Sequence, residues 1–118
     1  MKILILGVNG FIGNALASKL IKNKKNTIYG LDINHNNIKN LLSNKKFIFK
    51  KGYVEKNYKW VENHIKKSDI IIPLIAIATP RVYVTDPLKV FQLDFESNLK
   101  IIKLCSKYNK FILFPSTS

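Results

Sequence analysis

The 118-residue chain has few of the residues that mark specialised classes of protein. It has one cysteine, four prolines and five glycines, and 47% of its residues are hydrophobic. The low proline and glycine content, together with this apolar fraction, excludes a disordered or fibrous chain. Cys105 has no partner for an internal disulfide and lies in an apolar helical pattern, so we expect a small buried hydrophobe in a reducing cytoplasm.

Long hydrophobic runs are also missing. The longest, residues 70–78, contains Pro73 and is too short to cross a bilayer. The first residues lack the extended apolar stretch and the small-residue cleavage site of a signal peptide. We therefore expect a cytoplasmic protein that does not insert into a membrane.

Negative charge is scarce, with 7 acidic against 20 basic residues and a net charge of +13. Such an excess is typical of proteins that bind nucleic acids or anionic membrane surfaces. However, Arg81 is the only arginine, and the lysines occur as scattered pairs, whereas phosphate and base recognition favours arginine. The pattern favours a solvated lysine surface and no nucleic-acid partner. A lysine-driven nucleic-acid binder remains the weakest of the functional alternatives.

Short apolar runs alternate with segments of helical periodicity along the chain. We expect strands at residues 2–6, 27–31, 46–49, 70–73 and 111–114. Five apolar strands separated by helical segments predict an α/β fold. Right-handed crossovers make this a Rossmann-type, doubly wound parallel sheet in the order 3-2-1-4-5, with helices on both faces.

The expected helices lie between these strands. The first covers residues 11–21, a short one covers 38–42, and a modest one surrounds residues 60–65. A long helix begins with Asp86 as its cap and Pro87 in its first turn. The first helix repeats apolar residues at Ile12, Leu16 and Leu20, and the long helix does so at Leu88, Phe91, Phe95, Leu99 and Ile102.

Three glycines, Gly7, Gly10 and Gly13, lie where the first expected strand passes into the first expected helix. The first glycine permits the sharp turn, the second lets the backbone approach a pyrophosphate, and the third lets helix and strand pack closely. The helix N-terminus would offer unpaired N–H groups to the phosphates. No Gly-Lys-Ser/Thr follows, which excludes a Walker-type phosphate loop.

Asp32 ends the second expected strand, 19 positions after Gly13. A carboxylate at this place accepts hydrogen bonds from the adenosine ribose and repels a 2′-phosphate, so NAD is favoured over NADP as the cofactor. The alternative without a ligand is a packing turn followed by a capping aspartate.

The spacing Gly-x-x-Gly-x-x-Gly resembles that of the extended short-chain dehydrogenases/reductases that act on nucleotide sugars. Segments 5–14, 29–33, 75–80 and 114–118 are similar to the UDP-glucuronic acid decarboxylase domain of bifunctional polymyxin-resistance proteins. The resemblance covers residues 1–118. It implies that the chain is an NAD-binding Rossmann domain that is incomplete relative to the family.

The resemblance also implies a reaction. The family oxidises the C4 hydroxyl of UDP-glucuronate with NAD, and the resulting β-keto acid loses carbon dioxide to give a UDP-4-keto-pentose. In bacteria this product leads to the 4-amino-4-deoxy-arabinose that modifies lipid A and weakens the action of cationic peptides. The partner implied for this chain is UDP-glucuronate, and the full-length enzyme is expected to be a homo-oligomer.

The resemblance assigns site residues by position. NAD would contact Gly7, Asn9, Gly10, Phe11, Ile12, Gly13, Asp32, Tyr53, Val54 and Ala76. The sugar nucleotide would contact Ala78, Tyr83, Thr117 and Ser118, with Thr117 in a supporting catalytic role. The family usually has aspartate where this chain has Tyr53, which loosens the expected contact with the adenine end. His35 and His64 lie apart from other metal ligands, so no metal site is expected.

The catalytic Tyr-x-x-x-Lys pair of the family is missing. None of the five tyrosines is followed four positions later by lysine. Oxidation of an alcohol requires a base for the hydroxyl proton, so we expect this chain to be inactive alone. The apolar last strand would expose an edge, which favours a truncated gene product, a fragment or half of a split enzyme. A non-catalytic NAD-binding regulatory module, or a fragment of another nucleotide-sugar epimerase or dehydratase, remains the alternative.

Overall fold

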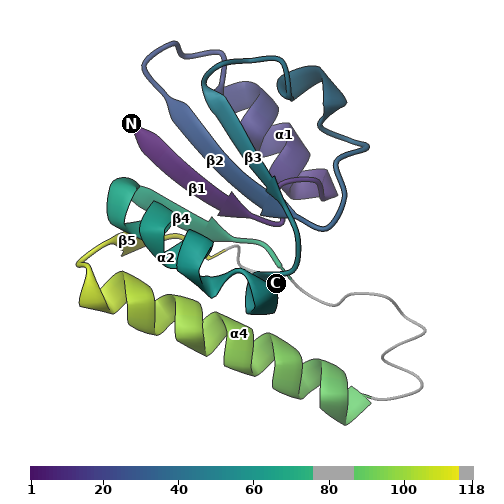
Figure 1. The fold of residues 1–118 in the computed structure, drawn as a ribbon, viewed down its shortest axis with the longest axis vertical. Helices are drawn as coiled ribbons and strands as arrows, with labels where there is room; N and C mark the ends of the chain where they lie inside the picture. Colours follow the sequence, from purple (N-terminus) through teal and green to yellow (C-terminus); the bar gives the residue numbers. More distant parts are fainter. Residues whose placement is uncertain (76–86, 115–118) are drawn as a thin grey trace.

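Strands and helices alternate along the chain, and the strands form a single sheet (Figure 1). The computed structural model describes residues 1–75 and 87–114, apart from the side chains of residues 87–95 and 97. The strands are β1 (Lys2–Leu6), β2 (Thr27–Asp32), β3 (Phe47–Lys51), β4 (Ile70–Pro73) and β5 (Phe111–Ile112). The helices are α1 (Phe11–Leu20), α2 (Tyr58–Lys67) and α4 (Pro87–Lys107), with short 3-10 helices η1 (Lys39–Leu41) and η2 (Val54–Lys56).

The five strands are parallel and follow the order β3-β2-β1-β4-β5. This order confirms the predicted Rossmann-type fold. The central strand β1 reads Lys-Ile-Leu-Ile-Leu, and four of its five residues are buried because helices cover both faces of the sheet. The expected bounds of β1 and β4 agree with the structure, whereas β5 is shorter than the expected strand.

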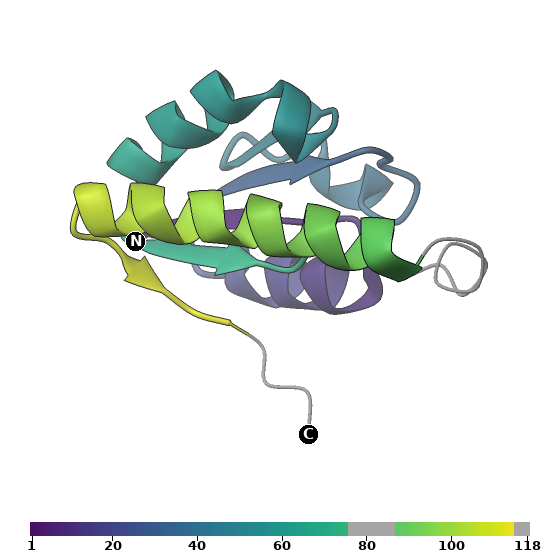
Figure 2. The same ribbon diagram turned by 90° about the horizontal axis from the view of Figure 1, so that it is seen from below.

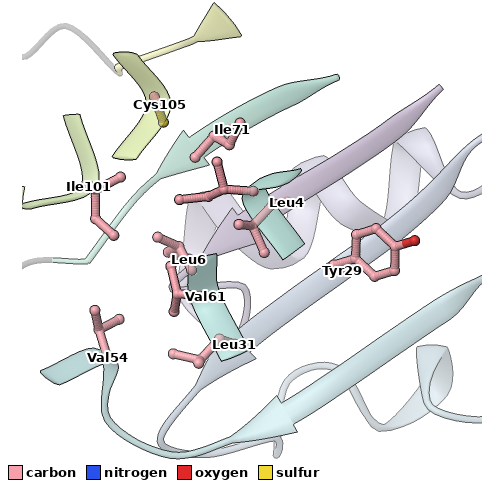
Figure 3. Packing of buried hydrophobic residues seen from close by; sticks show 10 residues of the cluster. Leu4, Leu6, Tyr29, Leu31, Val54, Val61, Ile71, Ile101 and Cys105 are labelled. Atoms are coloured by element: carbon pink, nitrogen blue, oxygen red, sulfur yellow. The ribbon is translucent and has the colours of Figure 1, made fainter. Parts of the chain in front are cut away.

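Two apolar cores lie on opposite faces of the sheet. Leu4 and Leu6 of β1 point towards α2 and α4, where they pack with Val61, Ile65 and Ile101 (Figure 3). The alternate β1 residues pack against α1 in the other core, whose buried members are Ile3, Ile5, Val8, Ala17, Ile28, Ile38, Leu41, Phe47 and Ile72. Figure 2 shows α1 and α2 on opposite sides of the sheet, with α4 in front, and α4 contributes Ile101 and Cys105 to the same core as α2.

The face that α1 turns to the sheet differs from the predicted one. Gly13 and Ala17 are its buried residues, whereas Ile12 is 57% exposed. Small side chains bring the helix axis close to the strands, so close packing decides the orientation here. The expectation that Ile12 shares the core face with Leu16 and Leu20 was wrong.

The predicted stripe along α4 was also wrong in its second half. Ile101 and Cys105 are buried in the core, whereas Leu99 and Ile102 are 38% and 40% exposed. The helix carries apolar residues on two sides in this stretch, and periodicity alone does not show which side meets the sheet. The cap Asp86 lies outside the described residues, as do the side chains of Leu88, Phe91 and Phe95.

Candidate functional site

Residues 7–13, which we call the glycine turn, join β1 to α1 at the point where the sheet changes its direction of winding. The neighbouring strands β1 and β4 lead into crossovers on opposite faces, and ligands of such folds bind outside the carboxyl ends of these strands. Gly7 follows β1 and has a φ of +90°, and a Cβ atom there would lie 3.1 Å from the backbone of Leu74, just after β4. Both the backbone conformation and the close approach therefore require glycine at position 7.

The other two glycines differ in what surrounds them. A Cβ atom at Gly13 would overlap the carbonyl oxygen of Gly7 and lie 2.9 Å from Cα of Val8. At Gly10 the nearest neighbour of such an atom would be the same Gly7 oxygen at 3.4 Å, an ordinary contact, and φ is −70°. Protein packing requires glycine at position 13, whereas at Gly10 the space above the backbone is open.

Helix α1 begins at this open space. Gly10 is its N-cap, and within the described residues no side chain caps the helix and no acidic residue occupies its first turn. The first N–H groups of a helix have no partner inside it. Phe11, the first helical residue, is 92% exposed. The N-terminus of α1 thus offers donors and a partial positive charge to an anion from solvent.

Asp32, at the carboxyl end of β2, is tied to the turn. Its Oδ2 accepts a hydrogen bond of 2.8 Å from the backbone N–H of Asn9, and its Oδ1 accepts one of 2.7 Å from the N–H of Ile33. These two bonds fix the plane of the carboxylate. Each carboxylate oxygen retains acceptor capacity, which a ribose hydroxyl can use.

Asn9 is almost fully buried, with 8% of its surface exposed, and its side chain bonds to the loop that follows β2. Its Nδ2 donates to Oδ1 of Asn36 at 2.8 Å, and its Oδ1 accepts from the backbone N–H of Asn37 at 2.7 Å. The Nδ2 of Asn37 donates to the Asn9 carbonyl oxygen at 2.9 Å. The Asn9 side chain therefore contacts protein. Sequence analysis did not single out Asn36 or Asn37.

The loop after β3 lies next to Asp32. The backbone N–H of Gly52 donates to the carbonyl oxygen of Asp32 at 2.9 Å. Tyr53 is 51% exposed, and Nζ of Lys56 lies 5.6 Å from the centre of its ring. The side chain of Val54 is buried in the core, so its backbone is the part that a ligand can reach. An exposed aromatic ring thus stands where the family usually has a carboxylate.

The loop after β2 also forms a hollow. Asn34, His35, Asn36 and Lys39 line an open pocket of about 380 Å³. Asp32 precedes this loop in the chain but does not line the pocket. The predicted contacts Ala76, Ala78, Tyr83, Thr117 and Ser118 lie outside the described residues.

Gly30 is a second feature that sequence analysis did not single out. A Cβ atom at this position of β2 would lie 2.8 Å from Cγ1 of Val8. Glycine here lets Val8 sink into the core beneath the turn, which helps to fix the turn on the sheet. A lone glycine inside an apolar strand was the available signal for such a close approach.

The titratable groups with shifted pKa values lie away from the turn. Burial lowers the pKa of His64, whose ring stacks on Trp60 with 3.8 Å between ring centroids. Burial raises the pKa of the Cys105 thiol, and the hydrogen bond from Tyr108 lowers the pKa of Glu62. Glu62 also pairs with Lys107 at 3.7 Å, which links α2 to α4.

Neither a metal cluster nor a membrane span is found in the described part of the chain. Histidine, cysteine and acidic side chains there do not gather in groups of three that could hold a metal ion. None of the helices in the described ranges combines the length and apolar composition needed to cross a membrane.

Comparison with known proteins agrees with this geometry. Residues 3–118 match the model of the NAD dependent epimerase/dehydratase family. The chain is 57% identical over 117 residues to the bifunctional polymyxin resistance protein ArnA of Wigglesworthia glossinidia brevipalpis, covering 99% of this chain and 18% of that protein.

Many solved structures share the fold, and two of them illustrate the similarity. The PbgP3 protein from Burkholderia pseudomallei is 46% identical with a TM-score of 0.89, over 98% of this chain and 35% of that one. UDP-glucuronic acid 4-epimerase from Bacillus cereus, in complex with UDP-glucuronic acid and NAD, is 25% identical with a TM-score of 0.87, over 100% of this chain and 40% of that one.

These matches confirm the resemblance to extended short-chain dehydrogenases/reductases, and the family description confirms NAD as the cofactor. The chain spans about a third of the PbgP3 chain and less than a fifth of the ArnA protein. A parallel sheet, a glycine turn at its switch point and a family match over residues 3–118 lead to one assignment. The chain belongs to the NAD-dependent epimerase/dehydratase family.

Proposed function

We propose that this chain is the NAD-binding segment of an enzyme that oxidatively decarboxylates UDP-glucuronate in the lipid A 4-amino-4-deoxy-arabinose pathway. The proposal joins two levels of support. The geometry of the glycine turn supports binding of a dinucleotide, and the similarity to ArnA and PbgP3 supports the nucleotide-sugar reaction. The binding of UDP-glucuronic acid and NAD by the related Bacillus cereus epimerase agrees with this substrate class.

The open space at Gly10 is the observation that carries the cofactor site. Gly7 and Gly13 are required by the packing of the chain itself, whereas no protein atom crowds a Cβ atom at position 10. Glycine at an uncrowded helix N-cap with ordinary φ fits a backbone that must pass close to a ligand. The donors exposed there fit a diphosphate.

In this proposal each part of the dinucleotide is held by a different element. The amides of the first turn of α1, at Phe11, Ile12 and Gly13, would hold the diphosphate, and the Asp32 carboxylate would hold the adenosine ribose. Gly7, Asn9 and Gly10 shape the turn, while Tyr53, the Val54 backbone and Ala76 would complete the cofactor contacts. Ala78, Tyr83, Thr117 and Ser118 remain the proposed contacts of the sugar nucleotide.

Bound NAD supplies the two-electron oxidant for the sugar C4 hydroxyl. This chain positions the cofactor, and Thr117 would orient the hydroxyl that reacts. A base for the hydroxyl proton is required as well, and the sequence has no Tyr-x-x-x-Lys pair to provide it. We therefore propose that the chain alone binds NAD and does not turn over UDP-glucuronate.

Three measurements test the proposal. Calorimetric titration of the folded chain should show binding of NAD, and absence of binding would contradict the site. Incubation with NAD and UDP-glucuronate should produce no NADH absorbance, and robust NADH formation would contradict the inactivity of the isolated chain. If a complementing segment restored turnover, a UDP-4-keto-hexuronate that retains the carboxylate, detected by mass spectrometry, would contradict decarboxylation.

The same cofactor site fits a second candidate, a non-catalytic module whose NAD occupancy regulates a partner protein. This candidate predicts a partner that binds the chain differently with and without NAD. The decarboxylase proposal instead predicts that a segment carrying Tyr-x-x-x-Lys restores turnover when it is added to the chain.

A further inference from the structure

Asn9 is one of only two buried polar or charged residues in the described part of the chain. It bonds through its backbone as well as its side chain. Its N–H donates to Asp32, and its carbonyl oxygen accepts from Nδ2 of Asn37. The side-chain oxygen accepts from the backbone N–H of the same Asn37, so two hydrogen bonds join these residues. We call this pair of bonds the Asn9–Asn37 clasp.

We infer that Asn37 is a positioning residue of the dinucleotide site, which acts by holding the Asn9–Gly10 peptide in the orientation that a diphosphate requires. The inference rests on the proposed NAD site. It concerns a residue that follows Asp32 by five positions and forms two hydrogen bonds with Asn9 of the turn.

The Asn9–Gly10 peptide unit is held at both of its ends, and the clasp holds its carbonyl end. The carbonyl oxygen of that unit belongs to Asn9 and is held by Asn37 at 2.9 Å. Its N–H belongs to Gly10 and donates to the Gly7 carbonyl oxygen at 3.2 Å. The plane of the peptide is thereby fixed immediately before the first turn of α1, because Gly10 is the N-cap of that helix.

Orientation of this peptide matters because carbonyl oxygens repel phosphates. Glycine at position 10 gives the peptide freedom to rotate, and a carbonyl turned towards the open side of the turn would place negative charge beside the diphosphate. The amide donor of Asn37 holds that carbonyl towards the loop after β2. The N–H of Asn9 also donates to the Asp32 carboxylate, which is the proposed contact of the ribose.

A matched pair of substitutions isolates the donor. Asn37→Asp removes the N–H that reaches the Asn9 carbonyl and keeps the side-chain shape. Asn36→Asp adds the same charge at the adjacent position but preserves the acceptor that Nδ2 of Asn9 uses. Any difference between the two variants therefore reports the lost hydrogen bond. A neutral pair, Asn37→Leu and the exposed Asn40→Leu, repeats the comparison without added charge.

ADP and adenosine are the probes, because only ADP carries the diphosphate. We expect N37D to bind ADP about tenfold more weakly than N36D, with N37L and N40L differing in the same direction. Adenosine affinity, followed by NMR shifts, should change less than about twofold between members of each pair. Unfolding midpoints measured in urea establish that each variant is folded.

Equal ADP affinities within both pairs would overturn the inference. A parallel loss of ADP and adenosine affinity with a lowered unfolding midpoint would also overturn it, because Asn37 would then support the fold in general. Failure of the unaltered chain to bind NAD contradicts the proposed function itself. Binding of NAD by the unaltered chain with no effect at Asn37 contradicts only the positioning role.

Discussion

Gly13 packs against the carbonyl oxygen of Gly7 so closely that a Cβ atom at position 13 would overlap it. The glycine turn therefore closes directly onto the first turn of α1. Gly13 is buried, and the backbone atoms of Gly7 and Val8 leave no room for a Cβ atom at this position. The glycines of the turn therefore differ in role: Gly13 is required by packing, whereas Gly10 is not.

Replacement of Gly13 by alanine should destabilise the fold. The added methyl group meets backbone atoms of Gly7 and Val8, which cannot turn away as a flexible side chain would. Overpacking of this kind costs about 1–3 kcal/mol of the free energy of unfolding. Urea titration of Gly13→Ala against the unaltered chain checks this value, and an unchanged midpoint would show that the helix shifts without cost.

Replacement of Gly10 by alanine should weaken NAD binding with little effect on the stability of the fold. The new methyl group makes only an ordinary contact, at 3.4 Å from the Gly7 oxygen. We expect the free energy of unfolding to change by less than about 1 kcal/mol, while NAD affinity falls at least about tenfold because the methyl group occupies the space of the diphosphate. Calorimetry and urea titration on the same sample separate the two effects. Normal NAD affinity in this variant would contradict the proposed placement of the diphosphate.

The sequence predicted the strands of this fold better than the faces of its helices. Apolar runs that alternate with helical segments predicted the strand order, because right-handed crossovers allow few strand orders in a parallel sheet. The same runs gave the bounds of β1 and β4. They misplaced the core faces of α1 and α4, where Ala17 and Ile101 are buried while Ile12 and Ile102 are exposed. In α1 side-chain size was misleading, because close packing favours the small residue.

The site was predictable only in its local part. Gly7, Gly10, Gly13 and Asp32 belong to a spacing pattern and could be selected from the sequence. The bonds from Asn9 to the loop after β2 join residues 27 and 28 positions apart, and a chain rich in asparagine offers no spacing rule to select them. Long-range polar contacts of this kind require coordinates.

Replacement of Asp32 by asparagine should weaken NAD binding and reduce discrimination against NADP. The carboxylate is held by the N–H groups of Asn9 and Ile33, beside the proposed ribose position. We expect NAD affinity to fall about tenfold and the preference for NAD over NADP to shrink, since the charge that repels a 2′-phosphate is removed.

Asp69→Asn provides the control for that experiment. Asp69 also accepts a backbone N–H, that of Lys2 at 2.8 Å, but it lies at the opposite end of the parallel strands. Titration of both variants with NAD and NADP should show an altered preference in Asp32→Asn alone. An equal change in the two variants would assign the effect to general destabilisation.

The stability of the fold should fall as His64 becomes protonated. The ring stacks on Trp60 and meets the edge of Tyr29 at a centroid distance of 4.8 Å. Burial, with a smaller contribution from Lys67, lowers the pKa of His64 from its ordinary value of 6.5, against the opposing effect of its hydrogen bond to the Trp60 carbonyl. The folded chain therefore binds a proton less readily at this position than the unfolded chain does.

This difference fixes the sign of the pH dependence. The contribution of His64 to stability is fully present above the unfolded pKa of about 6.5 and is lost as the pH falls through the lower folded value. Urea midpoints of the unaltered chain should decrease between about pH 7.5 and pH 5.5, and the decrease should be smaller in His64→Phe, which keeps an aromatic ring against Trp60. His35→Phe serves as the control with the same chemical change in the loop after β2. If His64→Phe and His35→Phe lose stability equally with falling pH, the packing of His64 does not set the acid sensitivity of this chain.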